Sequence, residues 1–262
     1  MNYPVHLAIL VLLWGYIYTS WSLMGRLGLV SFGHGAFMGI GAYTVVMLWN
    51  HFGLSPWLGA LAAFVFSTLV AILIGWPCFR FKIVGHYFAL VTLALSEVTR
   101  LIIVASRDYT GGSLGATPNG ALQAISEEEE AAASIGIHVT RAKLRITIIS
   151  ALMTCAGGIF YAQYQLYVNP DTVSGIAISL QMVFGVIAGG MFVMLGPTVG
   201  AAFTLLLAEG LRLAFGNRYP ALDTTIYGVM LVLFIIYMPK GILGAALDAW
   251  KSARRRNSVL ST

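Results

Sequence analysis

Charged residues are scarce in this chain, and their scarcity decides its class. Asp, Glu, Lys and Arg make up 10% of the 262 residues, whereas hydrophobic residues make up 58%. A soluble domain must keep enough polar surface to face water, so this composition excludes one. Eight apolar segments are long enough to cross the roughly 30 Å of bilayer hydrocarbon: residues 5–23, 28–49, 55–78, 84–105, 146–166, 179–195, 198–215 and 222–238. The sequence predicts an all-α, polytopic transmembrane helix bundle, with residues 1–262 forming one domain.

Cysteines and catalytic motifs are also scarce. Cys78 and Cys155 lie in or at the ends of apolar segments without C-x-x-C spacing, so we interpret both as packing residues. There is no G-x-x-x-x-G-K-[ST] phosphate loop and no H-E-x-x-H motif. Asp171 stands alone in a predicted outside loop, which leaves no carboxylate pair for acid–base chemistry. We expect no enzymatic activity, no metal site and no cofactor.

The distribution of positive charge argues against nucleic-acid binding and indicates topology instead. The net charge is +5, but the basic residues lie in short loops and in the tail, without interleaved aromatic residues. Lys and Arg stay preferentially on the cytoplasmic side of a membrane. We therefore expect the tail, residues 239–262 with Lys251 and Arg254–Arg256, to be cytoplasmic and close to anionic lipid.

The same rule gives conflicting sides for residues 106–145. Arg80 and Lys82 place the start of segment 84–105 on the cytoplasmic side, so this segment ends outside the cytoplasm. Arg141 and its basic neighbours, however, must again be cytoplasmic. No run of 18 apolar residues lies between them, and Glu127–Glu130 would not enter lipid. Three explanations remain open: one crossing is missing between residues 112 and 125, which we favour; segment 28–49 is re-entrant; or the charge rule fails here.

Two patterns inside the apolar segments have a structural and a functional interpretation. Four glycines lie within residues 31–43, which favours close helix packing, or alternatively an interrupted helix with Ser31 and His34 facing a pathway. Charged residues also recur at i, i+3 spacing, on one helix face. We interpret these pairs as structural ion pairs in preference to sites for a zwitterionic substrate: Glu97 with Arg100, and Glu209 with Arg212.

One polar segment, residues 122–145, contains an E-A-A-x-x-x-G pattern. Its members are Glu130, Ala131, Ala132 and Gly136, and Arg141 follows. Small residues beside charges, placed between apolar segments, are what a membrane protein would offer to a cytoplasmic partner. The alternative is a solvated amphipathic loop.

Taken together, these motifs resemble the permease subunits of ABC importers for branched-chain amino acids, of the type that carries a Y-F-A-L-V-T-L stretch. The similarity follows the family's order over most of the chain, although each piece alone is weak. Its main pieces are Leu27–Phe37, Gly39–Tyr43, Gly85–Leu93, Thr110–Gly112, Gly196–Ala201 and Pro239–Leu243. Family members are longer and carry a further span between the T-G-G turn and the E-A-A loop.

The resemblance implies a subunit that works with a homologous permease, two cytoplasmic ATPases and a periplasmic binding protein in the bacterial inner membrane. The E-A-A segment with Arg141 would then be the coupling loop that docks on an ATPase. Ser31, His34 and Thr92 would contact the substrate, which the resemblance suggests is Leu, Ile or Val. Two alternatives remain: an ABC importer of urea or short-chain amides, and, less favoured, a secondary transporter working alone.

Overall fold

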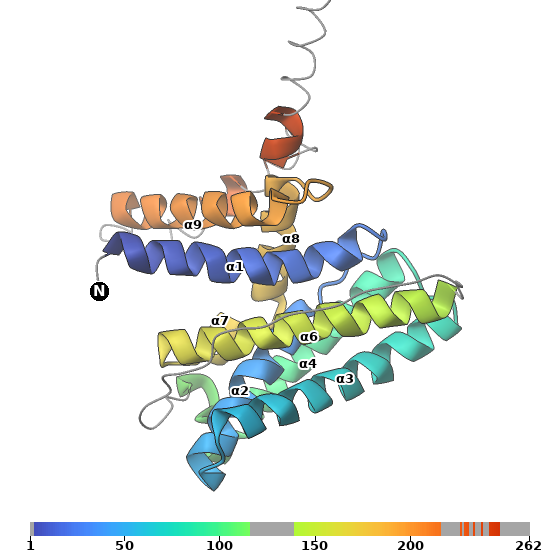
Figure 1. The fold of residues 1–262 in the computed structure, drawn as a ribbon, viewed down its shortest axis with the longest axis vertical. Helices are drawn as coiled ribbons and strands as arrows, with labels where there is room; N and C mark the ends of the chain where they lie inside the picture. The colour runs from blue at the N-terminus through green and yellow to red at the C-terminus, as the bar shows by residue number, and fades with distance from the viewer. Residues whose placement is uncertain are drawn as a thin grey trace, which may run out of the picture. The chain divides into compact units, whose positions relative to one another are not determined.

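A computed structural model describes residues 3–115 and 139–215, together with 226, 228–230, 233, 237 and 241–246. Every regular element among these residues is a helix, so the predicted all-α fold is confirmed (Figure 1). By its internal contacts the chain divides into two compact units. Unit 1 comprises Met1–Ser22 and Gln181–Thr262, and unit 2 comprises Leu23–Leu180.

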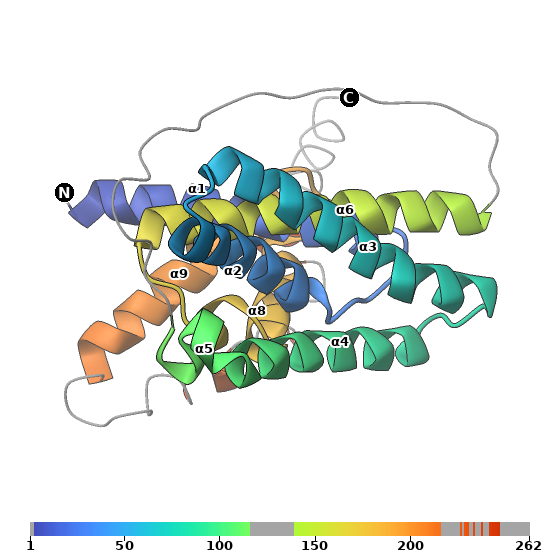
Figure 2. The ribbon, with the colours of Figure 1, turned by 90° about the horizontal axis from the view of Figure 1, so that it is seen from below.

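Unit 2 is built around one glycine-rich helix. This helix, α2 (His34–Phe52), packs against α3 (Pro56–Arg80), α4 (His86–Ala105) and α6 (Val139–Gln165), and α3 also packs against α6 (Figure 2). Shorter elements complete the unit: α5 (Arg107–Thr110), η1 (Gly112–Leu114), α7 (Pro170–Val173) and the start of α8 (Ile176–Gly189). The C-cap of α2 is Gly53, whose φ of 61° is left-handed, and Pro56 occupies the first turn of α3.

Unit 1 contains most of α1 (Tyr3–Gly25), the end of α8, and α9 (Gly196–Phe215). Glycines bring these helices together. A Cβ on Gly200 would overlap the carbonyl oxygen of Gly185, and one on Gly189 would overlap that of Gly196. These glycines allow the tight α8–α9 hairpin. Tyr18 of α1 adds a hydroxyl contact of 3.2 Å to Thr204 of α9.

The described helices agree with most of the predicted spans and correct others. By length and composition, five segments among the described residues could cross a membrane: Tyr3–Gly25, Pro56–Arg80, His86–Ala105, Thr140–Gln165 and Pro170–Gly189. The predicted span 28–49 is helical only from His34, and from there α2 is continuous, so an interrupted helix within this stretch is wrong. Helix α6 begins at Val139, well before the predicted residue 146. Most of the eighth span, 222–238, lies outside the described residues.

The two ends of unit 2 differ in charge. Leu144 and Ile146, near the start of α6, pack on a cluster that contains Leu29, Phe79 and Phe88. That end, here called the basic end, carries the cations Arg26, Arg80, Lys82, Arg141, Lys143 and Arg145, and no described Asp or Glu lies there. The described carboxylates of unit 2 lie on α4 and α7, toward the other end, here called the far end.

Helices α4 and α6 run in the same direction, from the basic end to the far end (Figure 2). At the far end, the Asn169 side-chain amide donates to the Ser113 carbonyl oxygen over 3.3 Å, so the segments that follow α6 and α4 lie together there. Gly115 and Val139 therefore lie at opposite ends of unit 2. At 1.5 Å per residue, the 27-residue α6 alone is about 40 Å long. The opposite positions of Gly115 and Val139 agree with the opposite sides that the charge rule assigns to the two ends of residues 106–145.

Candidate translocation and coupling residues

The backbone of α2 touches the backbone of α6. A Cβ on Gly41 would overlap the carbonyl oxygen of Cys155, and a Cβ on Gly158 would overlap that of Met38. In lipid, apolar burial does not drive helices together, so close packing of small residues has to supply the attraction. Both cysteines are buried and free, as packing residues would be. The glycine-rich stretch thus holds α2 in the centre of unit 2.

The three residues expected to contact substrate are buried at the start of α2. Ser31, His34 and Thr92 are exposed by 2%, 0% and 5%. The Thr92 hydroxyl accepts the Phe32 backbone N–H over 3.0 Å, and a Cβ on Gly33 would touch both Thr92 and Ser31. His34 instead faces α6, where its Nε2 lies 2.7 Å from the Ser150 hydroxyl. Ser31 and Thr92 therefore lie together, and His34 lies apart from them.

Little free space adjoins this cluster. The cavity that Ser31 and Thr92 help to line has a volume of about 10 Å³, which is room for about one water molecule. Within unit 2 these side chains serve as internal hydrogen-bonding groups. Their contact with a transported solute stays a prediction.

A second polar cluster is not evident from the sequence. The Ser179 hydroxyl of α8 accepts the Gly35 backbone N–H over 2.9 Å and lies 3.1 Å from the Ser96 hydroxyl of α4. Gly35 is in the first turn of α2, where backbone N–H groups lack helical partners. Ser179 therefore caps α2 and links it to α4 and α8. The available signal was the i, i+4 spacing of Thr92, Ser96 and Arg100 on one face of α4.

The Glu97–Arg100 pair forms and gains a third member. Arg100 donates to Glu97 Oε1 from Nη2 over 2.5 Å and from Nε over 3.0 Å. Its Nη1 also donates to Asp171 Oδ1 over 3.1 Å, so the expectation that Asp171 stands alone is wrong. The cluster therefore joins α4 to the segment that carries α7 and the start of α8.

The second predicted pair lies in unit 1. Arg212 Nη2 is 3.4 Å from Glu209 Oε1, and the Tyr3 hydroxyl donates to the same oxygen over 2.7 Å. The Arg212 side chain is 68% exposed, so this pair is not buried among the described helices. An exposed pair of this kind contributes little to stability, about 0–1 kcal/mol.

The coupling residues are described only in part. Glu130, Ala131, Ala132 and Gly136 lie outside the described residues, whereas Arg141 lies exposed in the first turn of α6 at the basic end. Residues 139–145, taken from the sequence as the end of a loop, are thus helical.

One further pattern occurs in the far-end turn, where residues 111–115 read G-x-S-x-G. A nucleophilic serine in this motif needs a strand-to-helix elbow. Here the stretch is a 3₁₀ turn between helices, so it does not have that geometry. Among the described residues, no three His, Cys, Asp or Glu side chains could hold a metal ion together.

Comparison with known proteins identifies the family. The model of the branched-chain amino acid transport system permease component matches residues 3–122 and 117–235. The high-affinity branched-chain amino acid permease LivM of Salmonella typhimurium (strain LT2) is 26% identical over 284 aligned positions, which cover 84% of this chain and 65% of LivM. LivM of Escherichia coli (strain K12) matches with the same identity and coverage. No solved structure gives a significant match.

The chain thus spans 65% of the length of these relatives. Its match to the family model runs through nearly all the described helices, including α2, α4 and α6 of unit 2. The helical, multi-pass architecture and the order of the motifs agree with that match. The chain belongs to the family of permease components of branched-chain amino acid transport systems.

Proposed function

We propose that this chain is the membrane-spanning subunit of an ATP-driven importer that carries Leu, Ile and Val across the bacterial inner membrane. The observation that carries the proposal is the match to the permease family over most of the chain. In its favour, the cations at the basic end of unit 2 are separated from its described carboxylates, as expected for a protein oriented in a membrane. The chain has no phosphate loop of its own, so the energy comes from separate ATPase subunits.

The basic end faces the cytoplasm in this proposal. Its six cations belong to three separate stretches of chain, around Arg26, Arg80 and Arg141, so the orientation does not depend on one loop. The E-A-A segment directly precedes α6 in the sequence, and α6 begins at this end. A docking segment there is accessible to a cytoplasmic ATPase, and the tail after residue 239 is cytoplasmic too.

The movement that ATP hydrolysis produces in the ATPase subunits would be transmitted along α6. This helix packs against both α2 and α3, and at Gly41 and Gly158 its backbone meets the backbone of α2 directly. Movement at the first turn of α6 would therefore move α2 and the polar residues around its start. The contacts that change with nucleotide belong to the ATPases, so the permease only transmits the motion.

The substrate is proposed from the relatives' names, which specify branched-chain amino acids. Ser31, His34 and Thr92 are the polar groups we assign to the pathway, which would lie against a homologous permease. A periplasmic binding protein delivers the amino acid at the far end. Most of the large buried side chains are apolar, which suits aliphatic solutes.

Reconstitution tests this function. Vesicles containing this chain, the partner permease and the two ATPases, with binding protein on the far side, are expected to take up radiolabelled leucine only when ATP is supplied. Omitting the ATPases should abolish uptake, and urea should not compete with leucine. Uptake that persists without ATPases would contradict the proposal and favour a secondary transporter, whereas competition by urea would reassign the substrate.

A further inference from the structure

A short segment at the far end of unit 2 is set apart from the helices on either side of it. This segment, residues 166–175, is here called the strap; it follows α6, contains α7 and leads into α8. Both of its ends have left-handed backbone, with φ of 55° at Leu166 and 90° at Gly175. Leucine rarely adopts this conformation, and the ends of elements are where lids turn when they open. The strap is therefore a separate piece with a turn at each end.

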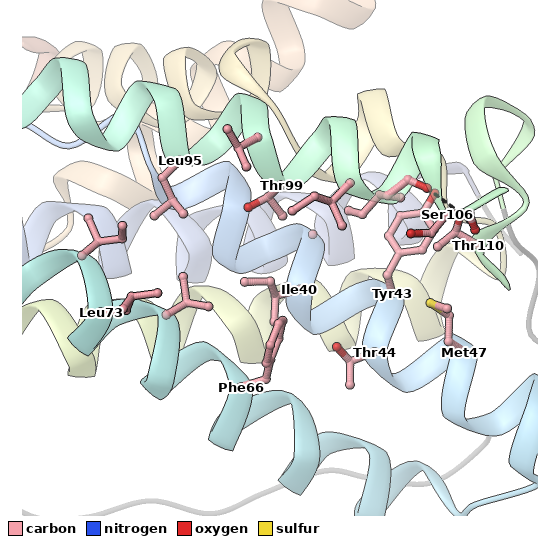
Figure 3. Close-up of a pocket in the computed structure, with 16 residues that line it drawn as sticks. Ile40, Tyr43, Thr44, Met47, Phe66, Leu73, Leu95, Thr99, Ser106 and Thr110 are labelled. Carbon is pink, nitrogen blue, oxygen red and sulfur yellow. Dashed lines mark hydrogen bonds between the residues drawn. The ribbon is translucent and has the colours of Figure 1, made fainter.

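The strap packs against α2 and α4. Its Val168 is fully buried. Tyr43 lies beside Thr110 in the wall of an apolar groove between α2, α3 and α4 (Figure 3), and its hydroxyl donates to the Val168 carbonyl oxygen over 3.1 Å. Ser174 is 1% exposed, and a Cβ on Gly39 of α2 would overlap its side chain. In this structure the strap is thus closed, with the Ser174 side chain between the strap and α2.

The strap is also tied to α4 by an ion pair that is held less firmly than its neighbour. Arg100 donates two N–H groups to Glu97 on the same helix, but only one to Asp171 of the strap, over 3.1 Å. The Asp171 side chain is 68% exposed, whereas that of Glu97 is 32% exposed. An exposed ion pair contributes little to stability, so Asp171 is the partner that another carboxylate can replace. Glu97 would stay in place and keep the guanidinium group in its orientation.

Polar groups continue from Arg100 into the interior of unit 2. Ser96 lies one turn away on the same face of α4 and meets the Ser179 hydroxyl of α8 over 3.1 Å, and Thr92 follows after a further turn. Thr92 is one of the residues that we assign to the pathway. A solute bound at Arg100 would therefore lie at the outer end of a line of hydroxyl groups that leads to Thr92.

We propose that Arg100 is a far-end binding site for the α-carboxylate of an amino acid, which replaces Asp171 and thereby releases the strap. The solute and the Asp171 side chain offer the same chemical group, and either fits one edge of a guanidinium. The freed Asp171 carboxylate then accepts the α-ammonium group. Because the solute reaches Arg100 Nη1 only after Asp171 has left, it binds the open state in preference and shifts the population toward it.

This inference rests on the proposed function and adds to it a reason for the selection of amino acids. Urea and short-chain amides have no carboxylate, so they would leave the pair of Arg100 and Asp171 in place. Leucinamide has the ammonium group and the side chain of leucine but not its carboxylate, so it would not release the strap either.

A cysteine beneath the strap tests the proposal. Ser174→Cys places a thiol where the serine hydroxyl has no hydrogen-bond partner among the described residues, so the exchange removes no hydrogen bond. Cys78 and Cys155 are replaced by alanine in this chain. The full chain in nanodiscs is treated with a small, charged methanethiosulfonate reagent, and the rate at which the new thiol is modified is measured. A second chain keeps Ser174 and Cys155, which is equally buried but lies in α6, and reports any general loosening.

Excess leucine is expected to raise the modification rate of the strap thiol several-fold, whereas leucinamide and urea should leave it unchanged. Asp171→Asn should raise the rate several-fold without any solute, because the strap loses its charged tie to α4. Arg100→Gln should do the same and should also abolish the response to leucine. Arg212→Gln is the matched control, since it removes the other Glu–Arg pair, in unit 1, and should respond to leucine as the parent does.

A rate that leucine does not change, or that leucinamide raises equally, would contradict the carboxylate site even if Asp171→Asn loosens the strap. Equal acceleration at Cys155 would also contradict it, because the whole unit would then be loosening. The labelling requires neither ATP nor ATPase subunits. Its failure is therefore distinct from failure of the proposed function, which leucine uptake by the reconstituted importer decides.

Discussion

Glu130→Arg and Gly136→Trp are each expected to abolish substrate-stimulated ATP hydrolysis by the assembled importer while leaving the permease in the membrane. Both residues belong to the E-A-A segment that we place on an ATPase subunit. Glu130 offers one negative charge to a basic partner, so reversal replaces attraction with repulsion. Gly136 allows close approach, which an indole ring would prevent. The measurement is ATP turnover with and without leucine-loaded binding protein, in parallel with the amount of each variant in the membrane.

A matched control is available three residues away. Glu127→Arg makes the same charge change in the same run of four glutamates but outside the motif, so it should keep its stimulated ATP turnover. If Glu127→Arg loses stimulated ATP turnover as completely as Glu130→Arg, then coupling depends on the net charge of the four glutamates and not on the motif. Stimulated turnover that is unchanged in both motif variants would remove the coupling role from this segment.

Gly41→Ala is expected to destabilise unit 2 more than its single added methyl group suggests. The new Cβ would overlap the backbone carbonyl oxygen of Cys155, and a backbone atom in the middle of a helix cannot rotate away. Overpacking typically costs about 1–3 kcal/mol, and we expect the upper part of that range because α2 must move away from α6. The midpoint of thermal unfolding in detergent measures the effect.

Gly210→Ala is the control for that experiment. Gly210 also lies within a helix, but a Cβ there meets nothing within 4 Å. Alanine favours a helix over glycine by up to about 1 kcal/mol, so this variant should be as stable as the parent or more so. Equal midpoints for Gly41→Ala and Gly210→Ala would mean that the α2–α6 contact is not as close as described.

The sequence predicts the helices best where long apolar runs end at turn residues. Segments 55–78 and 84–105 become α3 and α4 with boundaries within two residues, because Pro56 and Gly85 mark their starts. The prediction from the sequence is wrong at the start of α6, because three basic residues there led us to expect a loop instead of a helix. Arg141 and Arg145 are exposed there, while Leu144 between them packs on the core cluster. Long basic side chains can occupy the end of a spanning helix because their charged groups extend toward water.

Contacts between distant residues are what the sequence could not provide. Asp171 meets Arg100 across 71 positions, and Ser179 meets Gly35 across 144. Neither partner carries a local pattern that indicates the other. Glu97 with Arg100 was predictable because an i, i+3 pair shares a helix face. The parallel direction of α4 and α6, in contrast, was already implied by the charge rule. Basic residues precede α4, and others lie in the first turns of α6.

The most direct test of this orientation is labelling at the two ends of unit 2 with a membrane-impermeant maleimide. Ser113 lies exposed at the far end, and Thr140 lies exposed in the first turn of α6 at the basic end. In intact cells with a permeabilised outer membrane, we expect Ser113→Cys to be labelled and Thr140→Cys to be protected until the inner membrane is opened. Labelling of both from the same side would contradict the opposed ends of unit 2, and with them the docking of a cytoplasmic ATPase at its basic end.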